Sequence, residues 1–343
     1  MTQAQASSAP NVSDPLAEAL AEGVLAGQRR ALARAITLVE STRSDHRAMA
    51  SALLQRLAPH AGNSVRLGIS GVPGVGKSTF IEAFGIHVID AGHRVAVLSI
   101  DPSSAISGGS ILGDKTRMEE LSRRSEAYIR PSPSGNTLGG IARRTREVML
   151  LCEAAGFDVI LVETVGVGQS ETKVAEMTDM FLLLLLPGGG DELQGIKRGI
   201  MELADLVLVN KADGDLEATA GRSAAEYRSA LQLLHPRSAH WKVPVRTCSA
   251  RSGQGIDEAW QNVLDYRDTL QQSGEFDARR AAQARAWMWS EVNDSLVWAL
   301  QGDPEVRRRI PELESAVSEG RMPATLAARE LLELFLKHHE RWD

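Results

Sequence analysis

Residues Gly71-Val72-Pro73-Gly74-Val75-Gly76-Lys77-Ser78-Thr79 match the phosphate-binding loop pattern G-x-x-x-x-G-K-[ST] without a mismatch. The apolar stretch 65–70 that precedes them is typical of a buried strand, and residues 79–84 are typical of the start of a helix. This motif requires a strand on one side and a helix on the other. The sequence therefore predicts a nucleotide-binding fold built around this loop.

The residue types in this loop fit the chemistry of a polyphosphate. The glycines at 71, 74 and 76 let the backbone turn tightly and direct its N–H groups at phosphate oxygens. The positive end of the helix dipole adds to this attraction. Lys77 can reach the β- and γ-phosphates, and the Ser78 hydroxyl can ligate Mg²⁺. The competing interpretation is a glycine-rich turn that contains a lysine by chance.

The apolar runs of the chain predict its fold class. They lie at 65–70, 95–100, 158–163, 180–186, 205–209 and 243–247, and helical segments separate most of them. Continuous apolar strands that alternate with helices indicate a mostly parallel sheet with helices on both faces. We therefore expect an α/β fold of the P-loop NTPase type. Ligands of such sheets bind at the carboxyl ends of the strands, so the residues there are the candidate site.

The sequence predicts four segments. Residues 1–12 are rich in Ser, Ala, Gln and Asn and are predicted to be disordered, and 13–62 form a helical N-terminal extension. Residues 63–270 form the nucleotide-binding domain, and 271–343 form a helical C-terminal arm. The arm carries a broad apolar face that includes Trp289, Val292 and Leu296. Such a face predicts a protein interface, although these side chains could instead complete the core of the monomer.

Acidic residues follow two of the predicted strands. Asp101 comes directly after 95–100 and could ligate Mg²⁺ through water, while Asp114 could approach the metal or the attacking water. Alternatively, Asp101 caps the turn before Pro102 and Asp114 caps a helix. Glu163 ends the strand at 158–163, where its carboxylate could hold Mg²⁺, and the Gly166 amide could sense a γ-phosphate. Most G-proteins have Asp at the position of Glu163.

A glycine-rich segment follows the strand at 180–186. It contains three consecutive glycines and then Lys197. Glycines at a strand end indicate a mobile loop or a close approach to a ligand. Lys197 could place a cation near the transferred charge, or it could be a solvated helix residue.

The tetrapeptide Asn210-Lys211-Ala212-Asp213 follows the strand at 205–209 and matches N-K-x-D. A carboxylate at Asp213 can accept hydrogen bonds from guanine N1–H and from its exocyclic amine, whereas adenine would leave it unpaired. A buried unpaired polar group is costly, so this contact selects guanine. Lys211 can lie along the base, and Asn210 can tie this loop to the phosphate loop. The turn Ser249-Ala250-Arg251 can offer backbone N–H groups to the guanine oxygen.

The charge and composition of the chain exclude some classes of partner and some cellular locations. The net charge of −6 argues against nucleic acid, and the longest apolar run, 180–187, is too short to cross a bilayer. Cys152 and Cys248 lack a partner motif and are predicted to be reduced core residues of a cytosolic protein. The first 28 residues contain no Lys or Arg, which argues against a secretory signal or presequence and favours a bacterial cytoplasmic protein.

With these motifs the sequence resembles the MeaB/MMAA/ArgK family, G-protein chaperones of methylmalonyl-CoA mutase in the SIMIBI class of P-loop GTPases. The likeness covers nearly the whole chain. It is carried by the runs at 71–79, 101–104, 108–118, 162–170 and 210–213, of which Glu163-Thr-Val-Gly-Val-Gly-Gln169 is the most telling. Signal-recognition-particle GTPases share the general architecture but read D-T-A-G-R at that place.

The resemblance implies a GTPase that forms homodimers through its C-terminal helices. It implies binding to the mutase, or to a related adenosylcobalamin-dependent mutase, and use of GTP to gate cofactor delivery and to protect or reactivate that enzyme. By the same likeness, 101–118, 163–171 and 187–199 would be three switches. Gln194 and Lys197 match third-switch residues that reach the nucleotide when the mutase is bound.

The leading hypothesis is therefore a slow, Mg²⁺-dependent GTPase that loads a cofactor. Its catalytic candidates are Lys77, Asp101, Asp114, Glu163, Gly166 and Lys197, and GTP or GDP is its nucleotide. No glutamine directly follows Gly166, so slow turnover without a partner is expected. The alternatives are a metallochaperone for nickel or a similar ion, which should carry His/Cys clusters, and a small-molecule kinase, which usually selects adenine.

Overall fold

The computed structural model describes residues 15–41, 43–100, 118–130, 138–164, 170–188, 198–234 and 236–339. Within these ranges the chain forms two compact units. The first ends at Arg280 and contains the sheet, and the second begins at Ala281 and is helical. The candidate site belongs entirely to the first unit.

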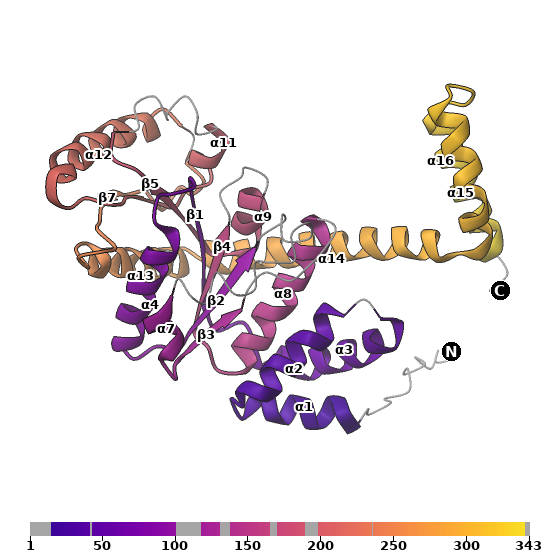
Figure 1. Cartoon of the computed structure of the whole chain (residues 1–343), viewed down its shortest axis with the longest axis horizontal. Helices are drawn as coiled ribbons and strands as arrows, with labels where there is room; N and C mark the ends of the chain where they lie inside the picture. Colours follow the sequence, from indigo (N-terminus) through magenta and orange to yellow (C-terminus); the bar gives the residue numbers. More distant parts are fainter. Residues whose placement is uncertain are drawn as a thin grey trace, which may run out of the picture. The chain divides into compact units, whose positions relative to one another are not determined.

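A parallel sheet forms the centre of the first unit (Figure 1). Its strands are β1 (Val65–Gly71), β2 (Val95–Ile100), β3 (Ala127–Arg130), β4 (Val159–Thr164), β5 (Met180–Leu185), β6 (Leu206–Val209) and β7 (Val245–Thr247). Their order across the seven-stranded sheet is β3-β2-β4-β1-β5-β6-β7, and every neighbouring pair is parallel. The predicted α/β fold is confirmed. Because β1 lies between β4 and β5, the carboxyl ends of these three parallel strands lie side by side.

Both faces of the sheet are covered, which explains why its strands are continuously apolar. Alternate residues of β5 point to opposite faces: Leu182 and Leu184 join one hydrophobic cluster, and Leu183 and Leu185 join another. The first cluster includes residues of α4 (Lys77–Asp90), α7 (Glu119–Arg123) and α13 (Ile256–Gln272). The second includes residues of α11 (Arg198–Met201) and α12 (Glu217–Leu231), which follows the short turn η2 (Gly214–Leu216).

Two further helices, α8 (Leu138–Ala154) and α9 (Ser170–Met177), lie across the sheet from α4 and α13 (Figure 1). Helix α9 packs closely on β1 at Gly68, where an added Cβ would lie 2.7 Å from Val174 and 2.8 Å from Thr178. Only glycine fits there, so α9 is held at a fixed distance from the strand that leads into the phosphate loop.

The N-terminal extension is helical, as the sequence predicts. It consists of α1 (Pro15–Leu25), α2 (Arg29–Glu40), α3 (Ser44–Leu57) and the turn η1 (Ala58–His60). Arg29 of α2 donates hydrogen bonds to the backbone carbonyls of Arg124, Ser125 and Ala127. Glu40, at the end of α2, forms an ion pair with Arg130 of β3. The extension is thereby fastened to β3, an edge strand whose exposed backbone would otherwise be open to pairing.

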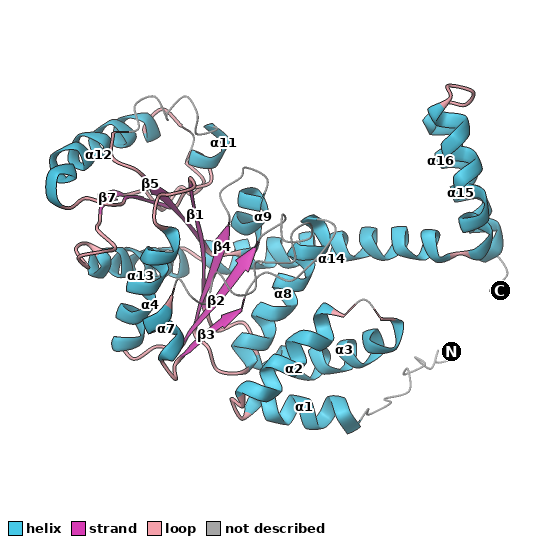
Figure 2. Cartoon of the chain, viewed as in Figure 1, coloured by secondary structure: helices cyan, strands magenta, loops and turns pink. Residues whose placement is uncertain are grey.

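The described part of the second unit, up to residue 339, is built from helices and the turns between them (Figure 2). The helices are most of α14 (Glu275–Gly302), α15 (Pro304–Ser318) and α16 (Ala324–His339). Asp303 caps α15 by accepting hydrogen bonds from the backbone N–H groups of Glu305 and Val306, at 2.9 and 3.0 Å. Arg309 of α15 pairs with Glu330 of α16 at 2.7 Å, so the two helices form a hairpin.

The observed elements differ from the sequence predictions at few places. Strand β3 was not predicted, and the predicted strands at 158–163, 180–186, 205–209 and 243–247 differ from β4 to β7 by one or two residues at their ends. None of the described helices combines the length and the apolar character needed to span a bilayer.

Candidate nucleotide-binding site

The phosphate loop connects β1 to α4 and has the backbone conformation that its glycines permit. Gly74 and Gly76 have φ values of 82° and 91°, in the left-handed region that disfavours other residues. Gly76 is the N-cap of α4, whose first residue is Lys77. A Cβ at Gly71 would lie 2.5 Å from the backbone oxygen of Leu184 in the neighbouring strand. The loop therefore places a helix N-terminus at the carboxyl ends of β1 and β5, where the backbone N–H groups can bind an anion.

Lys77 turns back over the loop that precedes it. Its Nζ donates a hydrogen bond of 2.7 Å to the backbone oxygen of Gly71 and approaches that of Val72 at 3.4 Å. Burial lowers the pKa of Lys77, and the nearby carboxylates of Glu163 and Glu171 oppose that shift. The ammonium is thus held at the phosphate loop beside two carboxylates, where it can meet a triphosphate.

Glu163 occupies the position expected for a metal-binding carboxylate. It is buried near the carboxyl end of β4, opposite Ile69 of β1 and Ser99 of β2 in the register of the sheet. The next residue, Thr164, donates a hydrogen bond of 2.9 Å to the Ser70 hydroxyl. Carboxylate and hydroxyl oxygens are the ligands that Mg²⁺ prefers, so the chemistry of Glu163 and Ser78 fits the metal site that the sequence predicts.

The predicted base-recognition loop, residues 210–213, is joined directly to the phosphate loop. The side-chain amide of Asn210, which follows β6, donates a hydrogen bond of 2.8 Å to the backbone oxygen of Val75. Lys211 has a positive φ of 59°, and its Nζ donates a hydrogen bond of 2.8 Å to the backbone oxygen of Gly74. The tie between the two loops that the sequence predicts for Asn210 is therefore present, and Lys211 adds a second.

A serine from the loop after β7 fixes the carboxylate of Asp213. The Ser249 hydroxyl donates a hydrogen bond of 2.7 Å to Asp213 Oδ1, and Ser249 itself is fully buried. The backbone N–H of Ser252 donates to the same Ser249 oxygen at 3.2 Å. The Asp213 carboxylate is thereby held in one orientation, and each of its oxygens keeps a lone pair that can accept a further donor.

Two backbone N–H groups of the turn 249–251 donate hydrogen bonds to other groups of the protein. The Ser249 N–H donates to the Gln254 backbone oxygen at 2.9 Å, and the Ala250 N–H donates to Asn210 Oδ1 at 3.1 Å. The sequence suggested that these amides face the guanine oxygen. In the structure the Ser249 amide closes the turn and the Ala250 amide binds Asn210, while Arg251 is exposed.

The described residues include the phosphate loop, Glu163 and the two predicted base-recognition segments, 210–213 and 249–251. The remaining candidates, Asp101, Asp114, Gly166, Gln194 and Lys197, lie outside the described residues.

One residue at the site was not singled out from the sequence. Glu171 lies in the first turn of α9, is 1% exposed, and is close enough to Lys77 to influence its pKa. A glutamate early in a helix is ordinary in sequence, so only its burial reveals it.

Comparisons with known proteins agree with this geometry. A family model described as methylmalonyl Co-A mutase-associated GTPase MeaB matches residues 32–305. A Caulobacter vibrioides protein named as a GTPase is 58% identical over 93% of this chain and 97% of its own length. GTPase ArgK of Escherichia coli is 47% identical over 90% of this chain and 93% of its own length.

A mitochondrial relative and a solved structure extend this likeness. The mouse protein named methylmalonic aciduria type A homolog is 51% identical over 92% of this chain and 79% of its own length. The crystal structure of a LAO/AO transport system kinase superposes with a TM-score of 0.74 and 38% identity, covering 95% of this chain and all of that one. The likeness therefore includes the sheet, the phosphate loop and the base-recognition loop.

Proposed function

The chain belongs to the MeaB family of GTPases, and from this membership we propose that it is a Mg²⁺-dependent chaperone of an adenosylcobalamin-dependent acyl-CoA mutase. In this proposal the GTPase gates delivery of the cofactor to the mutase and protects or reactivates it. The family description and the name of the mouse relative support methylmalonyl-CoA mutase as the partner. The observation that carries the nucleotide choice is the Ser249–Asp213 hydrogen bond beside the Asn210 tie to Val75.

The hydrolytic step is in-line attack of water on the γ-phosphate. Lys77 lies at the loop that cradles the phosphates, so its ammonium can stabilise the charge that develops on the γ-phosphate oxygens. Ser78 and Glu163, together with Asp101, would hold Mg²⁺, which when bound neutralises charge on the β- and γ-phosphates. The described residues thus supply candidates for phosphate binding, for the stabilising cation and for part of the metal site.

Slow turnover by the protein alone follows from what this chain lacks near Gly166. No glutamine directly follows that glycine to orient the attacking water. We infer that Gln194 and Lys197, the candidates in the third switch, reach the nucleotide when the mutase binds. The mutase would then accelerate hydrolysis by completing the site rather than by contacting the base.

We also infer that the protein is a homodimer whose interface involves the C-terminal helices. Helix α14 exposes Trp289 and Leu296 by 62% and 56%, and α16 exposes Leu332 and Leu336 by 50% and 56%. Large apolar side chains exposed on one helical unit are typical of protein interfaces. We also infer that the protein works in a bacterial cytoplasm, and the bacterial relatives named as GTPases support a bacterial origin.

Co-elution with purified methylmalonyl-CoA mutase tests the partner and the nucleotide gate together. The full-length protein is mixed with the mutase on a sizing column with light scattering, in GDP or in a non-hydrolysable GTP analogue. We expect a complex whose stability differs between the two nucleotides, and release of adenosylcobalamin to the mutase only after GTP is hydrolysed. Lys77→Ala should bind the mutase but fail in transfer. Absence of any complex in both nucleotides would refute the chaperone proposal while leaving the GTPase intact.

A further inference from the structure

A cavity of about 280 Å³ lies at the β7 side of the first unit, away from the nucleotide loops. Its walls come from the end of α11 and the turn after it, from the last turns of α12, and from the segment before β7. They consist of Met201, Glu202, Ala204, Arg228, Leu231, Gln232, Leu234, Pro236, Arg237, Lys242 and Val243. None of these residues belongs to the phosphate loop or to the base-recognition segments.

The lining of this cavity combines apolar side chains with positively charged ones. Met201 and Ala204 are buried members of the hydrophobic cluster beneath α12, and Leu231, Leu234 and Val243 pack against that cluster. The charged lining residues are Arg228, Arg237 and Lys242, against one carboxylate, Glu202. A cavity lined by both kinds of side chain fits a ligand that has a short apolar chain and a negatively charged head.

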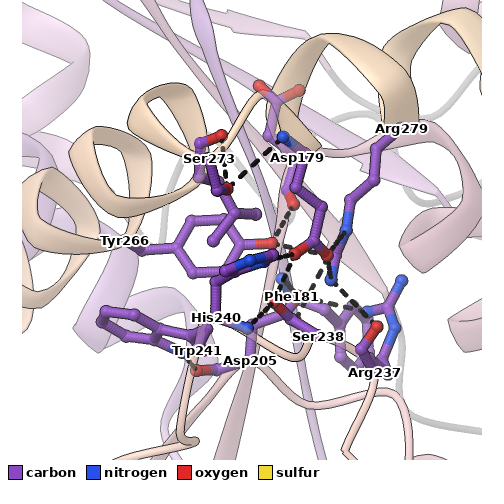
Figure 3. Close-up of polar contacts among 12 residues, drawn as sticks. Asp179, Phe181, Asp205, Arg237, Ser238, His240, Trp241, Tyr266, Ser273 and Arg279 are labelled. Atoms are coloured by element: carbon purple, nitrogen blue, oxygen red, sulfur yellow. Dashed lines mark hydrogen bonds and ion pairs between the residues drawn. The ribbon is translucent and has the colours of Figure 1, made fainter.

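The walls are held in place by contacts within the protein. Arg237 Nη1 donates to the Leu203 backbone oxygen at 2.6 Å and to Asp205 Oδ2 at 3.1 Å. Trp241 Nε1 donates to the Asp205 backbone oxygen at 2.8 Å, so the segment before β7 is fastened at two points (Figure 3). Arg228 Nη2 donates to the Val245 backbone oxygen at 3.2 Å. A pre-formed wall lowers the entropy cost of binding a small ligand.

Lys242 differs from Arg228 and Arg237, because those two side chains donate hydrogen bonds within the protein. It is exposed, and among the residues that the structure describes it has no ion-pair partner. An ammonium at the rim of an apolar cavity can meet a carboxylate without giving up an existing contact. Lys242 is therefore the residue expected to select the charge of the ligand.

We propose that this cavity is a binding site for a small amphipathic anion, namely a carboxylate on a short apolar chain. The chain lies against Leu231, Leu234 and Val243, and the carboxylate meets Lys242. At about 280 Å³ the cavity is at the lower limit for ligand pockets, so it accepts a molecule smaller than a nucleotide. This site is independent of the proposed function, since it shares no residue with the nucleotide site.

The position of the cavity connects it to the base of the C-terminal arm. Asp205 precedes β6 and Asn210 follows it, so Arg237 acts at the end of this strand opposite to guanine recognition. Arg237 and Arg279 pair with the two oxygens of the Asp205 carboxylate at 3.1 and 3.7 Å. Arg279 Nη2 also donates to the Arg237 backbone oxygen at 3.2 Å (Figure 3). Arg279 belongs to the first turns of α14. Arg237, a residue of the cavity wall, is therefore in contact with the first turns of α14.

Titration calorimetry of the full-length protein with hexanoate tests the proposal. Hexan-1-ol serves as the probe without charge, and inorganic phosphate as the probe without a chain. We expect saturable binding of hexanoate, with at least tenfold weaker binding of each control compound. Lys242→Ala and the cavity-filling Leu231→Trp should each weaken hexanoate binding at least tenfold. Arg246→Ala, which removes the same charge from the exposed face of β7 outside the cavity, should bind as the parent protein does.

Thermal unfolding of each variant establishes that it is folded, and GTP binding by each should stay within twofold of the parent. If Leu231→Trp does not fold, the comparison of Lys242→Ala with its control Arg246→Ala still tests the proposal. Hexanoate that fails to saturate, hexanol that binds equally well, or Lys242→Ala that binds unchanged would overturn the site. Failure of this kind would say nothing against GTP hydrolysis, so it is distinguishable from failure of the proposed function.

Discussion

The side-chain amide of Asn210 donates a hydrogen bond of 2.8 Å to the backbone oxygen of Val75, and this bond joins base recognition to phosphate binding. The other end of the same amide, Oδ1, accepts the Ala250 N–H at 3.1 Å, so one side chain connects three loops. Asn210 is 1% exposed, which means that these bonds form in an environment where water cannot replace them. The geometry of the nucleotide site therefore depends on a residue that need not touch the nucleotide.

Replacing Asn210 with alanine should weaken nucleotide binding, because the bonds that it removes lie within the protein and hold the nucleotide loops in place. The variant leaves the Val75 oxygen and the Ala250 N–H buried without their partner, which costs about 1–3 kcal/mol for each group. We expect GDP affinity to fall at least tenfold and the free energy of unfolding to fall as well. Fluorescent-nucleotide titration and urea unfolding measure the two effects. Asn262→Ala, which removes only a local bond to Glu258 on α13, is the control. Unchanged GDP affinity in Asn210→Ala would contradict the linking role.

Replacing Asp213 with asparagine should alter base selection far more than folding. An amide presents a donor where guanine N1–H and the exocyclic amine also present donors, so GTP affinity should fall about 100-fold or more. Xanthine carries a carbonyl in place of that amine, so XTP should bind the variant better than GTP does. Ser249→Ala, which removes the 2.7 Å bond to Asp213, should lower GTP affinity by a smaller factor, about fivefold to tenfold. Competition of GTP, XTP and ATP against labelled GDP measures all three, and equal ATP and GTP binding by the parent protein would refute guanine selection.

Replacing Arg280 with alanine should destabilise the first unit. Arg280 pairs with Asp179 at 2.7 Å, where the Asp179 side chain is only 2% exposed, and it also donates to the backbone oxygens of Gly62 and Ser64. Removing the guanidinium leaves a buried carboxylate without its cation, which costs about 3–5 kcal/mol. Urea unfolding measures this loss, and Asp179→Asn in the same background should recover part of it. Arg285→Ala, at an exposed position of α14, should change the stability by about 0.5 kcal/mol or less.

The stability of the first unit should also depend on the ionisation of Glu153. Burial alone would raise the Glu153 pKa, but hydrogen bonds from Arg66, Ser64 and the Gly62 amide outweigh it and lower the pKa below its ordinary value of 4.5. A carboxyl whose pKa is lower in the folded state stabilises the fold above the unfolded value, and this contribution disappears as the pH falls through the folded value.

Glu153→Gln should therefore be less stable than the parent protein at pH 7, and the difference should shrink below pH 4.5. Urea unfolding of both proteins between pH 7 and the acid limit of solubility measures it. Because other carboxyl groups titrate in both proteins alike, the difference isolates Glu153. A difference that stays constant across this range would contradict the proposed contribution of the ionised carboxylate.

Much of the fold could be predicted because its strands are continuous apolar runs. Strands β1 and β2 are buried along almost their whole length on both faces, and such runs are visible in sequence without any knowledge of their neighbours. Strand β3 could not be found in this way. It has only four residues, of which Tyr128 and Arg130 are partly exposed, so neither its length nor its pattern distinguishes it from a loop.

The candidate site likewise has a part that the sequence could predict and a part that it could not. The phosphate loop and the base motif are local patterns, so the sequence could predict where they lie and which side chains they present. The bonds that orient them join distant residues: Ser249 to Asp213 across 36 positions, Asn210 to Val75 across 135. No local pattern encodes such pairs, because they arise from the order of the strands. The same reason explains why the burial of Glu171 and the Arg280–Asp179 pair become visible only in the structure.

The measurement that tests the central claim most directly is steady-state GTP hydrolysis by the purified full-length protein, with and without methylmalonyl-CoA mutase, and with ATP in place of GTP. The account predicts slow turnover of GTP alone, no turnover of ATP, and a clear rise in the GTP rate when the mutase is added. The Lys77→Ala variant should show no turnover in any of these mixtures. Equal hydrolysis of ATP and GTP would contradict the guanine site, and guanine-specific turnover that no cobalamin-dependent mutase changes would contradict the chaperone role.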